Sequence, residues 1–436
     1  MIDKKIEDLP ESFCSVPWLQ IHTEPDGKVF PCCYYSHDSE HSLGNWNKEK
    51  TGDIFHGKKW NQLRKDFLDG KKPNSCTRCW KEEDAGIESM RLRFNERYSN
   101  FPDYTHQNNY NKYYDILCDG NNDGTVGDIK LATVDLIFNN LCNLKCRTCG
   151  PGLSTAWIPD EIKLGRSKIN PVSFVTNATV THMKDDLVAL VEMVDPYTEI
   201  HFTGGEPMMQ EDHYLFLQLL LDMDKTKVKL RYNTNLTTYT LKHYNAFEML
   251  KNFENVFIVG SCDAMGPEVE YIRKGLDWKE ALEWIKTCKE YLPNADYGIS
   301  AVYSAYNASA AVDFHRYMCE SELFKRGDGT NFGFYLNILQ DPYWMRTTIL
   351  PPDVKLEVTE KINKHIEWLS ETQEHDFHYD VFVNHWKGAI TLMNSKDDTS
   401  MIPKFYEEAR ALDGIRNEKF EDVFPDLHEK MKPYDK

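Results

Sequence analysis

Long hydrophobic segments are missing from this sequence. Nowhere do 18 apolar residues run together, and the N-terminal MIDKKIEDLPESF has no apolar stretch after its charges. A transmembrane helix needs about 20 consecutive apolar residues, and a secretory signal needs a shorter apolar core near the N-terminus. The sequence therefore predicts a soluble, cytoplasmic protein that has no membrane partner.

Positive charge is also scarce. The chain has 51 Lys and Arg against 69 Asp and Glu, a formal net charge of −18 at pH 7. Such a field repels a polyanion at long range, so we expect no nucleic-acid partner held through its phosphates. With 41% apolar and 13% aromatic residues there is ample material for packed cores, and 436 residues suggest two or three domains.

Cysteine is infrequent, with 12 residues among 436, but it is clustered. In a reducing compartment, clustered cysteines more often bind metal than form disulfides. One set lies near the N-terminus and a second follows a stretch of low apolar content; the sets are Cys14, Cys32, Cys33, Cys76 and Cys79, then Cys142, Cys146 and Cys149. The isolated cysteines, Cys118, Cys262, Cys288 and Cys319, are expected to be ordinary buried thiols.

The stretch between the two sets is rich in Asn, Asp, Tyr and Gly, which is typical of a connector. We therefore predict a small N-terminal α+β domain at 1–95, with a hairpin and a helix, and a connector at 96–128. A sheet domain would follow at 129–345. A helical extension at 346–436 would pack against it or cover the substrate.

Six strand-like runs alternate with helix-like runs in the sheet domain. The strands are predicted at 131–138, 198–204, 227–235, 255–261, 297–304 and 332–339. This alternation predicts an α/β fold with a parallel sheet, open or curved into a partial (β/α)6 TIM-like barrel. In such folds the chemistry lies at the carboxyl ends of the strands.

The second cysteine set directly follows the first of these strands. Cys142, Cys146 and Cys149 have the spacing CX3CX2C. Three thiolates can hold three irons of a [4Fe–4S] cluster and leave the fourth iron open to another ligand. The next strand ends in the sequence TGGEP at 203–207, where glycines let a ligand approach the backbone and a carboxylate can meet an ammonium group.

These two motifs, in this order and at strand ends, resemble the radical S-adenosylmethionine (SAM) superfamily. The resemblance covers about 130–345 and implies that SAM binds the open iron through its amino and carboxylate groups. It also implies a set of SAM contacts: Gly204, Gly205 and Glu206 at the amine, with Pro207 as a further cofactor-binding residue, and Asn233, Asn235, Ser261 and Asp263 at the ribose or carboxylate.

The resemblance further implies reductive cleavage of SAM to a 5′-deoxyadenosyl radical, which abstracts hydrogen from a substrate. The substrate would be a small molecule or a peptide, and a flavodoxin- or ferredoxin-type protein would supply the electron. Cys262, between two of the implied SAM contacts, is a candidate hydrogen donor.

The N-terminal set contains a GX4C element that ends at Cys32 and a CX2C pair, Cys76 and Cys79, with Cys14 upstream. A hairpin is predicted at 16–33 and a helix at 60–68. The set resembles the twitch, or half-SPASM, domain of radical SAM proteins of phages and bacteria. This resemblance implies an auxiliary [4Fe–4S] cluster on Cys14, Cys32, Cys76 and Cys79, suited to electron transfer and net oxidation.

Several alternatives remain open from the residues. Four cysteines also suit a structural zinc site, and Cys33 could replace its neighbour Cys32 as a ligand. The protein could be a peptide maturase of the same superfamily. It could also be a non-catalytic iron–sulfur electron carrier, or an interaction protein stabilised by zinc.

Overall fold

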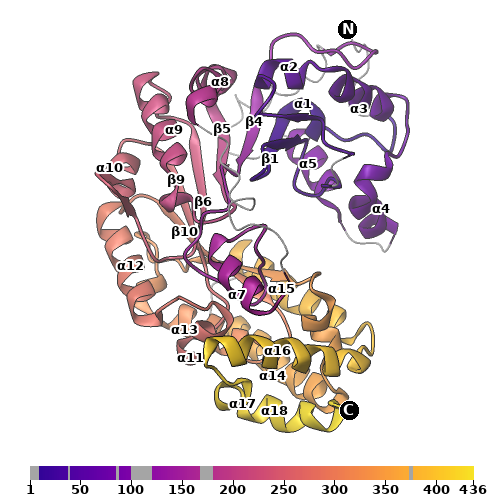
Figure 1. Ribbon diagram of the computed structural model, residues 1–436, viewed down its shortest axis with the longest axis vertical. Coiled ribbons are helices and arrows are strands. Elements are labelled where there is room, and N and C mark those ends of the chain that lie inside the picture. The colour runs from indigo at the N-terminus through magenta and orange to yellow at the C-terminus, as the bar shows by residue number, and fades with distance from the viewer. Residues whose placement is uncertain (1–8, 38–39, 85–87, 100–119, 167–179, 373–376) are drawn as a thin grey trace. The chain divides into compact units, whose positions relative to one another are not determined.

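The computed structural model describes residues 9–37, 40–84, 88–99, 120–166, 180–372 and 377–436. The chain divides into two compact units, each assembled from several segments (Figure 1). The first contains Met1–Asn139, Thr176–Arg231 and Leu241–Val256, and the second contains Asn140–Val175, Tyr232–Thr240 and Phe257–Lys436. The domain bounds at 1–95, 96–128, 129–345 and 346–436 stay predictions.

One sheet in the first unit joins the N-terminal residues to the first predicted barrel strands. β4 (Leu131–Leu136) pairs in parallel with β5 (Val194–Phe202) and, on its other side, with β1 (Gln20–Thr23). β1 then pairs antiparallel with β2 (Lys28–Phe30), and β2 with β3 (Gly44–Asn45). The indigo strand β1 can be followed beside β4 in Figure 1. The N-terminal hairpin therefore extends the parallel sheet.

The predicted hairpin at 16–33 is confirmed only in its second part. β1 and β2 pair with His22 opposite Phe30, and Gly27 takes a left-handed φ of 80° in the turn. Val16–Leu19 forms the short helix α1 and not a strand. Pro17 lies in its first turn, where a missing N–H and a fixed φ favour a helix.

The helices of the first unit cover its sheet and build the N-terminal region. The predicted helix at 60–68 is confirmed within α3, whose apolar stripe of Trp60, Leu63 and Phe67 is buried. The helices are α2 (Thr51–Phe55), α3 (Lys58–Leu68), η2 (Asn74–Cys76), α4 (Thr77–Asp84), α5 (Met90–Ser99), α8 (Val180–Met193), η5 (Pro207–Met209), α9 (Glu211–Asp222) and α10 (Ala246–Leu250).

Three parallel strands lie wholly or mostly in the second unit. β10 (Asp296–Tyr303) pairs with β9 (Asn255–Ser261) and with β11 (Gly333–Ile338). β6 (Lys229–Thr234) and β9 run from one unit into the other along the chain, and β7 (Thr240–Leu241) and β8 (Tyr244–Asn245) are short. All six predicted barrel strands are present, as β4, β5, β6, β9, β10 and β11, so the predicted parallel α/β class is confirmed.

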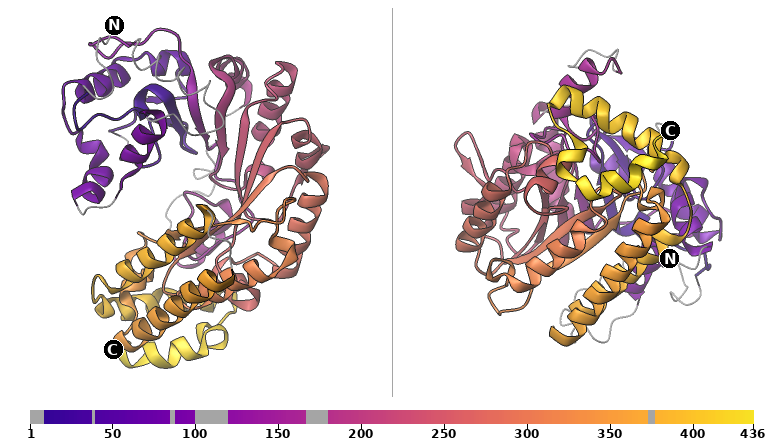
Figure 2. Two further views of the ribbon diagram at one scale, coloured as in Figure 1. Left: turned by 180° about the vertical axis from the view of Figure 1, so that it is seen from behind. Right: turned by 90° about the horizontal axis from the view of Figure 1, so that it is seen from below.

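Helices dominate the rest of the second unit, as predicted for the C-terminal part. They are η3 (Thr155–Trp157), α7 (Ile158–Lys163), α11 (Gly266–Ile272), α12 (Trp278–Tyr291), α13 (Ala310–Glu320), η6 (Glu322–Phe324), η7 (Tyr343–Met345), η8 (Thr347–Ile349), α14 (Pro352–Thr372), α15 (Phe377–Asn394), η9 (Thr399–Met401), α16 (Ile402–Arg416), α17 (Phe420–Val423), α18 (Pro425–Met431) and η10 (Lys432–Tyr434). Figure 2 shows the orange and yellow helices packed together. Trp386 of α15 is fully buried and stacks on Phe334 of β11 at 6.0 Å between ring centroids.

A search of the described residues finds no helix that is both long enough and apolar enough to cross a membrane.

Candidate functional site

The loop that holds Cys142, Cys146 and Cys149 belongs to the second unit, and the three thiols are half-buried. Burial, together with the charges of Cys149 and Cys142, raises the pKa of Cys146 to about 12 against the opposing effect of Arg273. Burial also raises the pKa of Cys149 to about 11, with a contribution from Cys142. The three thiols are therefore close enough for their charges to interact. Cys146 and Cys149 therefore carry protons at neutral pH without a metal, so metal binding would have to displace those protons.

The backbone of this loop is held by hydrogen bonds to the last residue of α11 and to the segment that follows it. The amide of Lys145 donates to the carbonyl of Lys274 at 2.9 Å, and the amide of Arg147 donates to the carbonyl of Ile272 at 2.7 Å. On the other side, Trp157 Nε1 donates to the carbonyl of Cys146 at 3.0 Å. The backbone is thus held at Lys145, Cys146 and Arg147, which fixes the positions from which the cysteine side chains extend.

Arg147, between two of these cysteines, ties the loop to the C-terminal helices. Its side chain is fully buried and contacts Asp413 at 2.5 Å and Glu418 at 2.9 Å. Its guanidinium also lies 3.5 Å from the ring centre of Tyr271. α7, which follows the loop, is tied to α16 in the same way by Arg416 and Asp160 at 2.8 Å. Sequence reasoning missed these anchors because each joins residues far apart in the chain.

Asn235 lies beside the cysteine loop. Its Nδ2 donates to Asn143 Oδ1 at 2.8 Å and lies 3.6 Å from Cys142 Sγ. Asn233, two residues earlier on β6, has a buried side-chain oxygen with no hydrogen-bond donor among the described residues. A buried acceptor of this kind fits a site that binds a polar ligand.

Ser261 is the last residue of β9, and Asp263 lies two residues after it. Asp263 is fully buried, and its carboxylate accepts from Arg273 and from the amide of Val302, each at 2.8 Å. The charge of Arg273 acts on both Asp263 and Cys146, so Asp263 belongs to the surroundings of the cysteine loop. Ser261 is half-buried and lies opposite Ser300 of β10.

The segment Gly204–Pro207 follows β5 in the first unit. Gly204 has a left-handed φ of 106°, and a Cβ on it would lie 2.4 Å from a side-chain carbon of Ile137. Glu206 is fully buried, and its carboxylate accepts from the amide of Met208 at 3.2 Å at the start of η5. A glycine is therefore required at position 204, and the carboxyl group of Glu206 is held inside the protein two residues later.

The structure brings the N-terminal cysteines together from separate elements. Cys14 precedes α1, Cys32 follows β2, Cys76 ends η2 and Cys79 lies in α4. Burial raises the pKa of Cys14 well above its usual range, and Cys76 and Cys79 raise it further. Burial likewise raises the pKa of Cys76, with contributions from Cys32 and Cys79. Four neighbouring thiols with raised pKa values fit a metal centre that would replace their protons.

Two further cysteines differ in their surroundings. Cys33 is exposed. Its pKa is raised to about 12, mainly by desolvation and then by the negative charge of Asp135. Cys262 is buried, and its Sγ lies 3.3 Å from the carbonyl oxygen of Ala264. Cys118 lies outside the described residues. Cys288 and Cys319 are buried, as expected of structural thiols.

A row of charged side chains crosses one face of the first unit's sheet. His22 of β1 is in register with Asp135 of β4, and Asp135 is in register with His201 of β5. Asp135 Oδ2 lies 2.7 Å from His22 Nδ1, and Asp135 Oδ1 lies 3.2 Å from His201 Nδ1. Burial alone would lower the pKa of His22, but the charge of Asp135 raises it to about 9. Parallel strands covered on both faces are normally apolar, so a buried row of charged side chains on this face is unusual.

The same face carries a second charged group around Glu199. Its carboxylate contacts Lys229 at 3.0 Å, Arg97 at 3.7 Å and Arg231 at 3.8 Å. Burial would raise the pKa of Glu199, but these cations lower it to about 2. Sequence reasoning passed over these residues. The alternation of charged and apolar residues within 131–136, 198–202 and 229–231 was the signal that could have found them.

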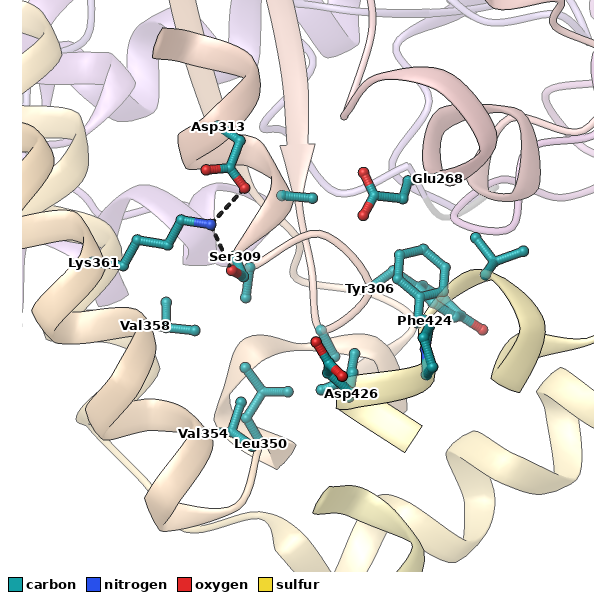
Figure 3. A pocket seen from close by; sticks show the side chains of 16 residues that line it. Glu268, Tyr306, Ser309, Asp313, Leu350, Val354, Val358, Lys361, Phe424 and Asp426 are labelled. Carbon is teal, nitrogen blue, oxygen red and sulfur yellow. Dashed lines mark hydrogen bonds and ion pairs between the residues drawn. The ribbon is translucent and has the colours of Figure 1, made fainter. Parts of the chain in front are cut away.

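The second unit also contains a pocket of about 310 Å³ between α11, α13, α14 and the α17–α18 turn. Figure 3 shows Glu268 and Asp426 at its wall, and Lys361 held by Asp313 and Ser309. Its lining contains no cysteine and none of the predicted SAM contacts. This pocket is therefore lined by residues other than those of the cysteine loop.

Comparisons with known proteins agree with the two cysteine sets. Residues 14–80 match the family model of an iron–sulfur cluster-binding domain called SPASM, and residues 136–303 match that of the radical SAM superfamily. The first region contains Cys14, Cys32, Cys76 and Cys79. The second contains Cys142, Cys146 and Cys149 and all the predicted SAM contacts.

Among curated proteins, the chain is 30% identical over 105 residues to a GTP 3′,8-cyclase of Campylobacter curvus, covering 24% of this chain and 26% of that protein. It is 27% identical over 96 residues to GTP 3′,8-cyclase 3 of Mycobacterium bovis, covering 22% and 20%. The matches thus span about a quarter or less of these relatives. Among solved structures, native anSMEcpe with bound AdoMet and Cp18Cys peptide is 17% identical with a TM-score of 0.37, covering 56% of this chain and 59% of that one. Streptococcus suis SuiB is 14% identical with a TM-score of 0.36, covering 72% and 63%.

Proposed function

This chain belongs to the radical SAM superfamily and has a SPASM-type iron–sulfur domain before the radical SAM domain, and from this premise we propose that it oxidises a polar substrate by hydrogen abstraction. The observation that carries the proposal is the set of three neighbouring thiols, Cys142, Cys146 and Cys149, on one anchored loop. Three ligands are the number that leaves one iron of a [4Fe–4S] cluster available to SAM.

The residues of this loop fit such a cluster. The thiols are half-buried and affect one another's pKa, and the loop backbone is fixed on both sides. Asn235 Nδ2 points an N–H at Cys142 Sγ from 3.6 Å. Hydrogen bonds to the sulfur ligands are one of the means by which a protein sets the reduction potential of a cluster.

SAM would be bound by residues that are already oriented. Gly204, Gly205 and Glu206 would bind its amine, with the buried Glu206 carboxylate supplying the negative charge, and Pro207 would line the same segment. Asn233 would use its unpaired side-chain oxygen, and Asn235 would act beside the cluster. Ser261 and Asp263 would approach the ribose or carboxylate, with Arg273 and the amide of Val302 fixing the Asp263 carboxylate.

When bound, the cluster and SAM together supply one-electron cleavage of a carbon–sulfur bond, which yields a 5′-deoxyadenosyl radical. The chain positions the reactants and excludes water from them. Arg147 locks the cysteine loop to α16, and the buried Phe138 and Leu144 supply apolar surface before and within that loop.

The N-terminal domain would hold an auxiliary [4Fe–4S] cluster on Cys14, Cys32, Cys76 and Cys79. With four protein ligands it would have no open iron, which suits removal of an electron from the substrate-derived product. A flavodoxin- or ferredoxin-type reductant would deliver the electron that starts the reaction. Both clusters need a reducing compartment, so we place the protein in the cytoplasm.

The charged face of β1, β4 and β5 supports a polar substrate. Asp135, His201 and Glu199 project from the strands near their carboxyl ends, where α/β proteins bind their substrates. A small polar molecule is our first candidate, in line with the curated relatives, which are named for a reaction of GTP. A peptide is the second candidate, because a peptide backbone and polar side chains would also pair with this face.

The experiment that tests the proposal is anaerobic reconstitution followed by elemental analysis. Two [4Fe–4S] clusters predict about eight irons per chain, and Cys76→Ala should lower this to about four. The reduced Cys76→Ala protein should still cleave SAM but should not complete substrate oxidation. Cys319→Ala, which removes a buried thiol in α13, is the matched control and should keep both clusters.

Three results would contradict parts of this proposal. Zinc in place of iron would support a zinc-stabilised interaction protein. Full iron loading with no SAM cleavage would support an electron carrier. Normal product formation by Cys76→Ala would remove the role of the auxiliary cluster. Transfer of deuterium from a labelled candidate into 5′-deoxyadenosine would identify the substrate class.

A further inference from the structure

Three side chains with metal-ligand chemistry meet in the first unit, outside both cysteine sets. His22 and Glu24 lie at the end of β1, and His37 follows β2. One ligand atom from each lies within 4.8 Å of the other two. They are brought together by the β1–β2 hairpin, whose tight turn returns the chain to the same place.

The spacing of these atoms is that of neighbouring ligands around one ion. Glu24 Oε1 lies 3.0 Å from His22 Nε2 and 2.9 Å from His37 Nδ1. Two ligands at about 2.1 Å from a divalent ion and at right angles to each other are about 3.0 Å apart. Hydrogen bonds share this spacing, so the distances alone do not decide between a proton and a metal ion.

The second observation is the orientation of His22. Its Nδ1 lies 2.7 Å from Asp135 Oδ2, and the two side chains are only 3% and 7% exposed. A carboxylate that accepts from one ring nitrogen directs the lone pair of the other nitrogen at a metal, and metal-binding histidines almost always have such a partner. Here this leaves Nε2 facing Glu24. The ring of His37 is also held, because it stacks on Phe30 at 4.6 Å.

The outer side of the group is accessible. The side chain of His37 is 34% exposed and that of Glu24 is 19% exposed, whereas His22 is buried. An ion could therefore enter from the solvent and keep coordination positions that the protein does not fill. Two histidines and one carboxylate with open positions form a known binding set for divalent iron, and zinc accepts the same ligands.

We propose that His22, Glu24 and His37 bind one divalent transition-metal ion of the zinc or iron(II) class, with Asp135 orienting His22. The ion would lie at the carboxyl ends of β1 and β4, and its open positions would accept an oxygen ligand, either water or an oxygen of the substrate. This site does not depend on SAM cleavage.

The test uses Co²⁺ as the probe, added to the anaerobically purified full-length protein with its iron–sulfur clusters assembled. Oxidised [4Fe–4S] clusters are diamagnetic, so the electron paramagnetic resonance signal of high-spin Co²⁺ is observed against little background. Equilibrium dialysis counts the bound ions. The variants are His37→Ala and Glu24→Gln, and the control is His56→Ala, an exposed histidine of the same unit.

Wild type and His56→Ala should bind one Co²⁺ per chain with the same affinity. His37→Ala and Glu24→Gln should lose this binding, and Asp135→Asn should weaken it about 10–100-fold. The iron content of each variant must equal that of wild type, which shows that the fold and the cysteine sites are intact. Absence of Co²⁺ binding to wild type, or equal binding by His37→Ala and Glu24→Gln, would overturn the proposal. The test measures bound cobalt and not SAM cleavage. A protein that fails to cleave SAM can therefore still show the predicted cobalt binding.

Discussion

Removal of the Arg147 side chain should loosen the cysteine loop from the C-terminal helices. Arg147→Met keeps most of the apolar stem but removes the guanidinium that contacts Asp413, Glu418 and the ring of Tyr271. The two carboxylates are 10% and 13% exposed. Glu418 would keep Lys274 at 2.9 Å, whereas Asp413 would lose the one cation that contacts it among the described residues and would remain in a largely dry site. Breaking a buried ion pair in this way costs about 3–5 kcal/mol.

A loss of about 3 kcal/mol corresponds to an increase of about 100-fold in the equilibrium constant for local opening, at about 1.4 kcal/mol per factor of ten. If reclosing is fast, the rate of iron release to a chelator follows this equilibrium. The iron bound by Cys142, Cys146 and Cys149 would be about half of the total. We therefore expect Arg147→Met to release this half about 100 times faster than wild type, and the iron of the N-terminal cysteines at the wild-type rate. The measurement is the absorbance of the iron–chelator complex under anaerobic conditions.

The matched control is Arg166→Met, which removes an ion pair to Glu408 at 2.6 Å in the same unit. Arg166 is 36% exposed, and Glu408 would keep a second cation, Lys404, at 2.8 Å. Loss of this partly exposed pair should therefore cost less than about 1 kcal/mol. Its iron-release rate should stay within about fivefold of wild type. Equal rates for the two variants would refute the reasoning that the buried Arg147 anchors the loop.

Three other variants have defined outcomes. Gly204→Ala should weaken SAM binding in equilibrium dialysis, because Gly204 has a left-handed φ and an added Cβ would have no room. Gly414→Ala, where a Cβ would meet open space, should bind SAM like wild type. Equal SAM binding by the two variants would contradict the steric argument. Burial lowers the pKa of His213 to about 3, so between pH 6.5 and 3 the unfolded chain binds a proton that the folded chain does not, and stability falls as the pH drops. Denaturant unfolding of wild type should lose about 2 kcal/mol more between pH 7 and pH 5 than that of His213→Gln, and parallel losses would contradict the assignment. Cys33→Ala should keep all the iron if Cys32 is the ligand, and loss of about four irons would assign the ligand to Cys33.

The strand pattern could be predicted because each strand carries a local signal. Runs such as those at 255–261 and 297–304 are rich in residues that favour strands and are bounded by turn residues. The cysteine motifs are also local, since their ligands are a few residues apart. The start of the hairpin could not be predicted in the same way, because Val16–Leu19 is apolar in either conformation and Pro17 decided for a helix.

The anchors of the loop and the pairing of β1 with β4 depend on contacts between distant residues. Arg147 and Asp413 are separated by 266 positions, and no pattern near either of them indicates the other. The same holds for His22 and Asp135, which are 113 positions apart and meet only because β1 joins the parallel sheet. Single-sequence patterns describe elements and motifs, whereas such pairs follow from the tertiary fold.

The central claim is tested most directly by the formation of 5′-deoxyadenosine. The anaerobically reconstituted protein is reduced with dithionite, mixed with SAM and assayed by chromatography. Wild type and Cys319→Ala should produce 5′-deoxyadenosine, and Cys146→Ala should produce none because one ligand of the SAM-binding cluster is missing. Failure of the fully iron-loaded wild type to form it, or equal formation by Cys146→Ala, would contradict the account.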